Sequence, residues 1–116
     1  MNSSSFVGTI ACAAFFLTAC AKQPLAVRGF QGQTLSVAVG QELDVTLQTV
    51  GPGQYESPPM VSSPSLQFLS VAFVGPYVPA GPTQQFKFKG EAPGQAIVVF
   101  QHSGNNPTIT DIVNVY

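Results

Sequence analysis

The sequence predicts an all-β domain, an antiparallel β-sandwich of about seven strands that follows an apolar N-terminal leader. Apolar and polar residues alternate with period two over most of residues 34–116, as they do in half-buried strands. Glycine (11) and proline (10) stand between the alternating runs as turn residues, and apolar residues make up 45% of the chain. The 116 residues, less the 19 of the leader, leave 97, which suffice for one small domain.

The leader resembles a bacterial lipoprotein signal. Residues 6–18 form an apolar run that suits a signal peptide and is shorter than the roughly 20 residues a transmembrane helix needs. The sequence Leu-Thr-Ala at residues 17–19 is typical of a lipobox, so we expect cleavage before Cys20 and a diacylglycerol on its thiol. Residues 1–5 carry no lysine or arginine, unlike most secretory signals. A disulfide between Cys12 and Cys20 is the alternative, and it requires both cysteines to survive processing.

The lipid predicts where the protein resides. We expect a protein of the bacterial cell envelope, attached to the membrane by the lipid on Cys20. Lysine rather than aspartate at position 22 favours the outer membrane, facing the periplasm, in a Gram-negative cell. Residues 21–32 lack a clear period and contain Pro24, Gly29 and Gly32, as a tether does. The expected layout is therefore a signal peptide (1–19), a lipidated cysteine with its tether (20–33) and a β-domain (34–116).

The strands are expected where the alternation is regular. The clearest is 42–48, in which Leu43, Val45 and Leu47 face a core while Glu42 and Asp44 serve as solubilising surface charge. The alternation shifts phase near Phe68 and Leu69, which predicts a β-bulge. Residues 95–101 are apolar on both faces, as in the middle of a sheet. The full set of expected strands is 34–39 (with Leu35, Val37 and Val39 inward), 42–48, a weak 60–62, 66–74, 84–89 (with Phe86 and Phe88 inward), 95–101 and 108–116.

The connections between these strands predict a recognition surface. Successive strands alternate in direction, so the longer connections 49–57, 75–83 and 103–107 gather at one end of the sandwich. Three clustered loops on a rigid scaffold are a common binding surface, as in immunoglobulin-like domains. The prediction depends on the weak strand at 60–62, because its loss reverses the end at which every later loop lies.

Three segments resemble a known protein family. Residues 34–43 (TLSVAVGQEL), 80–89 (AGPTQQFKFK) and 92–100 (APGQAIVVF) are similar to corresponding segments of chagasin-type inhibitors of papain-like cysteine proteases. The resemblance runs from about residue 34 to 116. It implies an immunoglobulin-like sandwich whose three loops wedge into a protease cleft, and a papain-like protease as partner.

The loop motifs of that family are not matched. The family has an Asn-Pro-Thr-Thr-Gly type motif in its first loop, where residues 49–55 of this chain read TVGPGQY. The Gly-rich motif of the middle loop is reduced to residues 79–82 (PAGP), and the Arg-Pro-aromatic motif of the third is replaced by residues 102–107 (HSGNNP). The chain contains no tryptophan. No functional residue of the family therefore transfers by identity.

Composition excludes several classes of chemistry. Charged residues are 8% of the chain and the net charge is −1, so no basic surface is available for nucleic acid. One histidine, without a free cysteine in the mature chain, cannot complete a zinc shell, and no cofactor is expected. A triad of Ser103, His102 and Asp111 can be written, but adjacent strand-end residues point apart. We therefore expect a protein that is not an enzyme.

The expected function is recognition of a protein partner through the three loops, with protease inhibition as the activity that the resemblance implies. Loop aromatics often act as contact anchors, whereas loop proline and glycine also serve turn geometry. The expected contact residues are Tyr55, Tyr77, Pro79, Gly81, His102 and Asn105. The alternative is a structural lipoprotein of the cell envelope with no partner at its loops.

Overall fold

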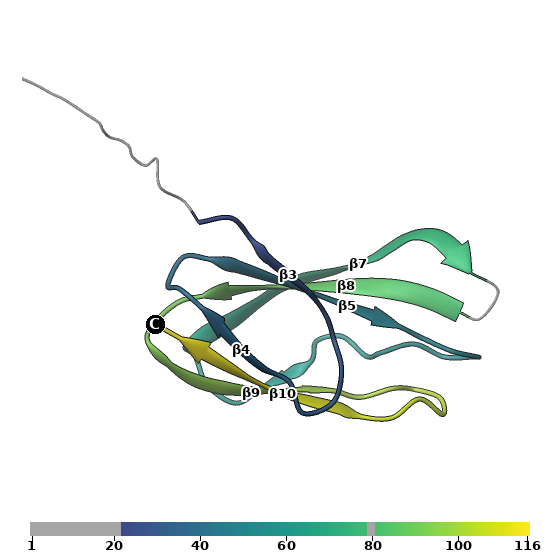
Figure 1. Ribbon diagram of the computed structural model, residues 1–116. Coiled ribbons are helices and arrows are strands. Elements are labelled where there is room, and N and C mark those ends of the chain that lie inside the picture. Colours follow the sequence, from purple (N-terminus) through teal and green to yellow (C-terminus); the bar gives the residue numbers. More distant parts are fainter. Residues whose placement is uncertain (1–21, 79–80) are drawn as a thin grey trace, which may run out of the picture.

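Two four-stranded sheets pack face to face in the computed structural model of the chain (Figure 1), which describes residues 22–78 and 81–116. One sheet has the order β4-β10-β9-β6 and the other the order β3-β5-β8-β7. The strands are β3 (Leu25–Arg28), β4 (Thr34–Val37), β5 (Glu42–Gln48), β6 (Met60–Val61), β7 (Leu66–Val78), β8 (Gly81–Gly90), β9 (Gly94–Phe100) and β10 (Ile109–Val115). The expected signal peptide, Cys20 and Pro79 lie outside the described residues.

The fold class predicted from the sequence is confirmed, with one difference in strand direction. The sheets are mixed rather than purely antiparallel, because β4 pairs with β10 in parallel and β3 pairs with β5 in parallel. The other four strand pairings are antiparallel. Residues 22–78 and 81–116 include no helix with the length and hydropathy that a membrane span requires.

Strand β3 lies in the segment expected to be a tether. Its Leu25 and Val27 pack against the core while Ala26 and Arg28 are exposed, so the segment alternates over four residues. Its parallel register sets Leu25 beside Leu43 of β5. The strand was not predicted because four residues between Pro24 and Gly29 are too few to establish a period.

The remaining strands lie close to their predicted positions. The bounds of β5 match the prediction, the weak strand is present as β6, and the predicted bulge is confirmed by a register shift between Phe68 and Ser70. The expected loop 75–83 is wrong in its length. β7 continues to Val78 and β8 starts at Gly81, since a second register shift between Val74 and Val78 lets the pairing resume beyond Pro76.

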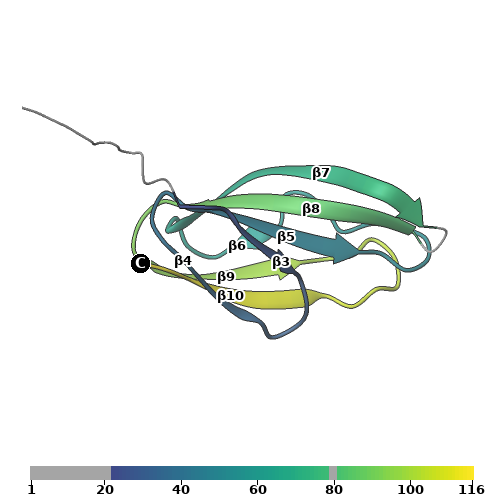
Figure 2. The same cartoon turned by 45° about the horizontal axis from the view of Figure 1, so that its top comes forward.

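The two ends of the sandwich differ in what they carry. At one end the first described residues meet the C-terminus: the Lys22 ammonium lies 5.1 Å from the centre of the Tyr116 ring, and the Val39 amide donates to the Tyr116 carbonyl at 2.8 Å. At the opposite end lie the exits of β5 and β9 and the β7–β8 hairpin (Figures 1 and 2). We call this second end the loop end and define it as residues 49–55, 81–83 and 102–107.

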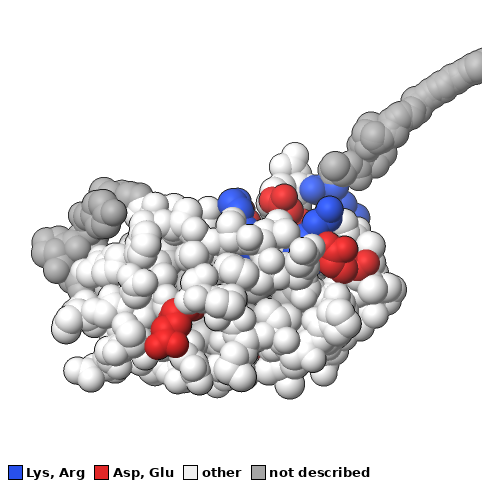
Figure 3. All heavy atoms as spheres, turned by 180° about the vertical axis from the view of Figure 1, so that it is seen from behind, with Lys and Arg blue, Asp and Glu red and all other residues white. Residues whose placement is uncertain are grey.

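Most charged residues lie away from the loop end, although the exposed Glu56 directly follows it. The register sets Glu42 opposite Lys89 and Asp44 opposite Lys87, whose ammonium lies 3.1 Å from the Asp44 carboxylate. Asp44 is only 9% exposed, less than expected of a surface residue, because β3 runs beside β5. Figure 3 shows most of the charge on one face near the point where the N-terminal segment leaves. The loop end contains no Asp, Glu, Lys or Arg.

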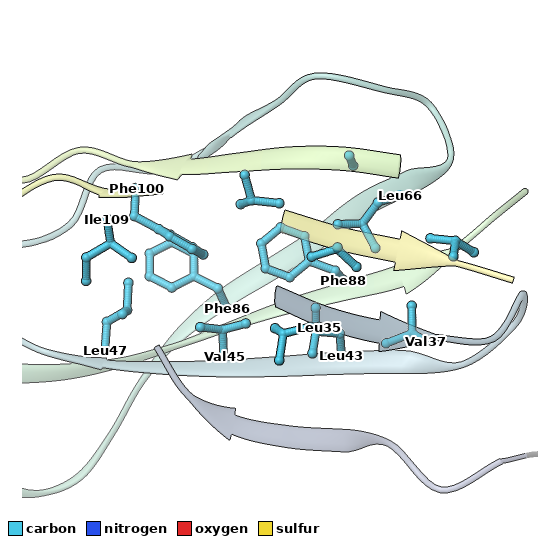
Figure 4. Packing of buried hydrophobic residues seen from close by; sticks show 14 of the residues in the cluster. Leu35, Val37, Leu43, Val45, Leu47, Leu66, Phe86, Phe88, Phe100 and Ile109 are labelled. Atoms are coloured by element: carbon cyan, nitrogen blue, oxygen red, sulfur yellow. The ribbon is translucent and has the colours of Figure 1, made fainter. Parts of the chain in front are cut away.

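The core lies between the two sheets, and its largest fully buried side chains are Phe86, Phe88 and Phe100 (Figure 4). The Phe100 ring stands edge-on to the rings of Phe86 and Phe88, with centroid distances of 5.1 and 6.1 Å. One expectation about burial is wrong, since Val39 is 48% exposed because β4 ends at Val37. β9 lies in the middle of its sheet as predicted, and its Ile97 is 42% exposed because only alternate residues of the strand face the core.

Candidate protein-binding loop end

Hydrogen bonds between distant segments hold the loop end together. The Thr49 amide donates to the Pro82 carbonyl at 2.9 Å, which joins the first loop to the start of β8. The Gln48 side-chain amide donates to the Gly81 carbonyl at 3.0 Å and to the Thr49 carbonyl at 2.9 Å. The predicted convergence of the connections at one end is thus confirmed for the described residues.

Asn106 joins the first loop to the third. Its Oδ1 accepts a hydrogen bond from the Val50 amide at 2.9 Å, and its Nδ2 donates to the Val50 carbonyl at 2.7 Å. The side-chain amide thereby supplies the donor and acceptor that a neighbouring strand would offer. Both backbone groups of Val50 are fixed, while its side chain is 65% exposed at the tip.

Tyr55 is a buried brace rather than a surface contact. It is 2% exposed, its hydroxyl donates to the Pro107 carbonyl at 3.2 Å, and burial raises the pKa of its phenol above the ordinary value of 10.0. Its backbone amide and carbonyl both bond the side-chain amide of Gln84 at 2.8 Å. The expectation that Tyr55 contacts a partner is therefore wrong. The backbone at Tyr55 pairs with the third loop through an antiparallel bridge to His102, and the Tyr55 ring is buried.

Hydrogen bonds at both ring nitrogens hold the His102 ring in place. Its Nδ1 accepts the Gly104 amide at 2.8 Å, so the ring proton is assigned to Nε2, which donates to the Thr49 hydroxyl at 3.0 Å. The ring also stands edge-on to Tyr55 at a centroid distance of 4.7 Å. Because both nitrogens are engaged, the half-buried ring positions the loops and offers no free base.

The residues of the conceivable triad are not assembled. The Ser103 hydroxyl accepts from the Gln54 amide at 3.0 Å and donates to the Gln54 carbonyl at 3.1 Å. Asp111 is buried in β10 and accepts from the Gln33 amide at 3.0 Å. Each of the two side chains, like His102, has a structural partner elsewhere, so the geometry lacks the relay that nucleophilic catalysis needs.

Gly81 permits the close approach of the first loop. Its φ is +144°, a conformation that L-residues with a side chain rarely adopt. A Cβ there would lie 2.8 Å from the Thr49 carbonyl oxygen and 2.9 Å from that of Gly51. Gly81, expected to contact a partner, therefore also has a structural role, because only glycine allows the start of β8 to pack against residues 49–51.

The other expected contacts are placed as follows. Asn105 is exposed in the third loop, and residues 50–53 are exposed in the first. Tyr77 lies near the end of β7, on the strand that leads to the loop end. Sequence reasoning missed Thr49, Gln84 and Asn106. Only Gln84 gave a signal, because a polar residue stands in phase with the inward Phe86 and Phe88.

The surface of this end is not hollowed. The described residues form no pocket, and they include no group of three or more His, Cys, Asp or Glu side chains able to hold a metal ion. Small-molecule sites are usually concave.

Solved structures share this fold. The cysteine protease inhibitor EhICP2 from Entamoeba histolytica matches with a TM-score of 0.64 at 10% identity, over 81% of this chain and 96% of the inhibitor. Amebosin matches with a TM-score of 0.54 at 21% identity, over 80% and 98%. No protein-family model matches the sequence, and no curated protein matches it. The similarity is one of fold, and it confirms the fold that the chagasin-type resemblance implied.

Proposed function

We propose that this protein is a lipid-anchored inhibitor of a papain-like cysteine protease and blocks the enzyme by inserting its loop end into the active-site cleft. The observation that carries the proposal is the fixed presentation of Val50, whose backbone is held on both sides by Asn106 while its side chain is exposed. EhICP2, a protein of the same fold, is a cysteine protease inhibitor and not an enzyme. That likeness supports binding rather than catalysis for this chain as well.

The hydrogen bonds of the loop end favour tight binding because they order the loops in advance. Binding by a mobile loop loses affinity through the entropy of ordering its side chains and backbone. Here the first loop is tied to β8 through Thr49 and to the third loop through Val50, and Gln54 is tied to Ser103. The described loops therefore lose little further freedom when a partner is bound.

The surface chemistry of the loop end suits an uncharged, narrow cleft. The described loop residues contain no Asp, Glu, Lys or Arg, and the exposed residues include Val50 and residues 51–53 (GPG) in the first loop and Asn105 in the third. Such a tip is thin and buries no charge when it enters a cleft, so no ion has to be desolvated. A projecting tip also matches the absence of a pocket among the described residues.

A lipid anchor on Cys20 would also leave the loop end accessible to a protease. A lipid on Cys20 would hold the chain two residues before Lys22, which lies beside Tyr116 at the end opposite the loop end. The loop end then faces away from the membrane, toward the periplasm if the anchor sits in the outer membrane of a Gram-negative cell. Replacing Cys20 by alanine should move the protein from the membrane to the soluble fraction, and unchanged membrane association would contradict the anchor.

Inhibition is tested by titrating papain with the full chain purified in mild detergent. Val50→Asp places a charge at the tip and should weaken inhibition by about 30-fold or more, because a buried unpaired charge costs about 2 kcal/mol or more. Val39→Asp is the matched control, since Val39 is also an exposed loop valine but lies at the anchor end. Failure of the wild-type chain to inhibit papain-like enzymes, or equal loss in both variants, would refute the proposed mode. A structural envelope role predicts no inhibition by either form.

A further inference from the structure

The four edge strands of the sandwich differ greatly in length. β3 and β4 have four residues each and β6 has two, whereas β7 has 13. An edge strand presents unpaired backbone donors and acceptors, and short edges limit pairing with other chains. Three edges are therefore protected by shortness, and β7 is not.

β7 also lacks the charges that usually protect a long edge. Its sequence, LQFLSVAFVGPYV, contains no Lys, Arg, Asp or Glu. Two features interrupt it: the bulge between Phe68 and Ser70, and Pro76, which has no amide hydrogen. Between them lies the segment Ser70–Val74, which pairs with β8 on one side and with no described strand on the other. We call this segment the open edge.

We propose that the open edge pairs with the open edge of a second copy of this chain, antiparallel, about a two-fold axis at Ala72. The bulge and Pro76 flank the segment almost symmetrically, and Ala72 is its centre, so this register pairs every residue of the segment. It sets Ala72 opposite Ala72 of the second copy, and Phe73 opposite its Val71. Aromatic and β-branched residues are favourable cross-strand partners.

The side chains of the open edge fit this occupant. Ser70 and Ala72 are exposed and small, and Phe73 is 49% exposed, so pairing removes apolar surface from water. The segment is uncharged, and a copy therefore meets no repulsion from itself. A two-fold interface requires such self-complementarity.

Pairing at β7 is independent of the proposed inhibition. Antiparallel strands direct the two loop ends away from each other, so neither loop end is covered. A single anchored copy stands with its loop end away from the membrane, whereas two lipid-anchored copies paired in this way lie with their long axes along it. The two sheets join into one continuous eight-stranded sheet, β3-β5-β8-β7 followed by the same strands in reverse.

The test uses two differently tagged full-length copies, co-expressed and purified in mild detergent through one tag. Wild-type copies should co-purify. Ala72→Lys in both copies, or Ala72→Glu in both, places like charges opposite each other and should reduce co-purification by about fivefold. A lysine variant mixed with a glutamate variant should restore it, because the two charges are then opposite in sign.

The controls separate pairing from folding. Gln85→Lys puts the same charge on β8, directly beside Ala72 in the sheet but away from the edge, and should leave co-purification unchanged. Each variant should retain the thermal midpoint of the wild type, since Ala72 is exposed. Lack of co-purification of wild-type copies overturns the proposal, as does co-purification that Ala72→Lys leaves intact or that the mixed pair fails to restore.

Discussion

Replacing Asp111 by asparagine should stabilise the protein at neutral pH. Asp111 lies on the inward face of β10 between Ile109 and Val113 and is 2% exposed. Its Oδ1 accepts the Gln33 amide, while its Oδ2 is buried with no partner, as is the Gln33 Oε1. Burial raises the pKa of Asp111, and the hydrogen bond from the Gln33 amide partly opposes this shift.

The direction of the pH dependence follows from this raised pKa. The folded state binds the Asp111 proton more tightly than the unfolded state, whose carboxyl has a pKa of about 3.9. The contribution of Asp111 therefore favours folding below the unfolded pKa and is lost as pH rises through the folded pKa. Above the folded pKa the group is a buried carboxylate with one unpartnered oxygen, which costs about 1–3 kcal/mol.

Asparagine keeps an acceptor for the Gln33 amide, carries no charge and provides donors where Oδ2 has no partner. We expect a gain of about 1 kcal/mol at pH 7. That gain raises the thermal midpoint by about 5 °C for a domain of this size. The gain should shrink as pH falls through the folded pKa, because the wild-type carboxyl then becomes protonated.

Thermal unfolding followed by circular dichroism between pH 4 and 8 measures the effect. The difference between the midpoints of the two proteins isolates Asp111 from the other carboxyl groups. Asp44→Asn is a suitable control, because Asp44 pairs with Lys87 outside the core and its replacement should bring no stabilisation at pH 7. Destabilisation by Asp111→Asn at pH 7, or a gain that is the same at every pH, would refute the reasoning.

Two further predictions concern the loop end. Asn106→Ala removes both hydrogen bonds to Val50 and should lower the free energy of unfolding by about 1–2 kcal/mol. Hydrogen exchange at the Val50 amide should also accelerate. An unchanged exchange rate would show that the Asn106 side chain does not hold the Val50 backbone. Gly81→Ala should lower the free energy of unfolding, measured with denaturant, by about 2 kcal/mol or more, because the new Cβ meets two backbone oxygens and the φ is unfavourable for alanine. An unchanged free energy of unfolding would show that residues 49–51 move aside at little cost.

The sequence allowed the strands to be predicted where alternation is long enough to show its phase. Glu42–Gln48 alternates over seven residues and was placed without error, and the phase shift near Phe68 located the bulge. Leu25–Arg28 has only four residues, and its burial depends on a parallel partner, β5, that no local pattern reveals. The extension of β7 was missed for a similar reason. Gly75 and Pro76 are typical turn residues, and they lie in the strand only because a register shift between Val74 and Val78 lets its pairing with β8 resume.

The loop end could be located from strand order, but the roles of its residues could not be read from residue type. Tyr55 is an aromatic residue in a polar loop, which is the pattern expected of an exposed contact. It is buried because it bonds Gln84 and Pro107, which lie 29 and 52 positions away in the sequence. His102 similarly owes its tautomer to Gly104 and Thr49. Such partners are fixed only when the sandwich brings the loops together, so a pattern within one loop carries no information about them.

The bonds that shape the loop end also explain how its tip can differ from the chagasin-type motifs while the fold is kept. The bonds from Asn106 reach only backbone atoms of Val50, and Gln84 reaches only backbone atoms of Tyr55. A side chain at position 50 contributes nothing to these bonds, so the tip is free to vary without loss of its position.

Under the proposed inhibition, residues 50–53 and Asn105 would then select which protease is bound, while Thr49, Gln84 and Asn106 determine that the tip is presented at all. Exchanging the residues at the tip should therefore change the spectrum of proteases inhibited without changing thermal stability, whereas changing the supports should reduce inhibition of every protease together.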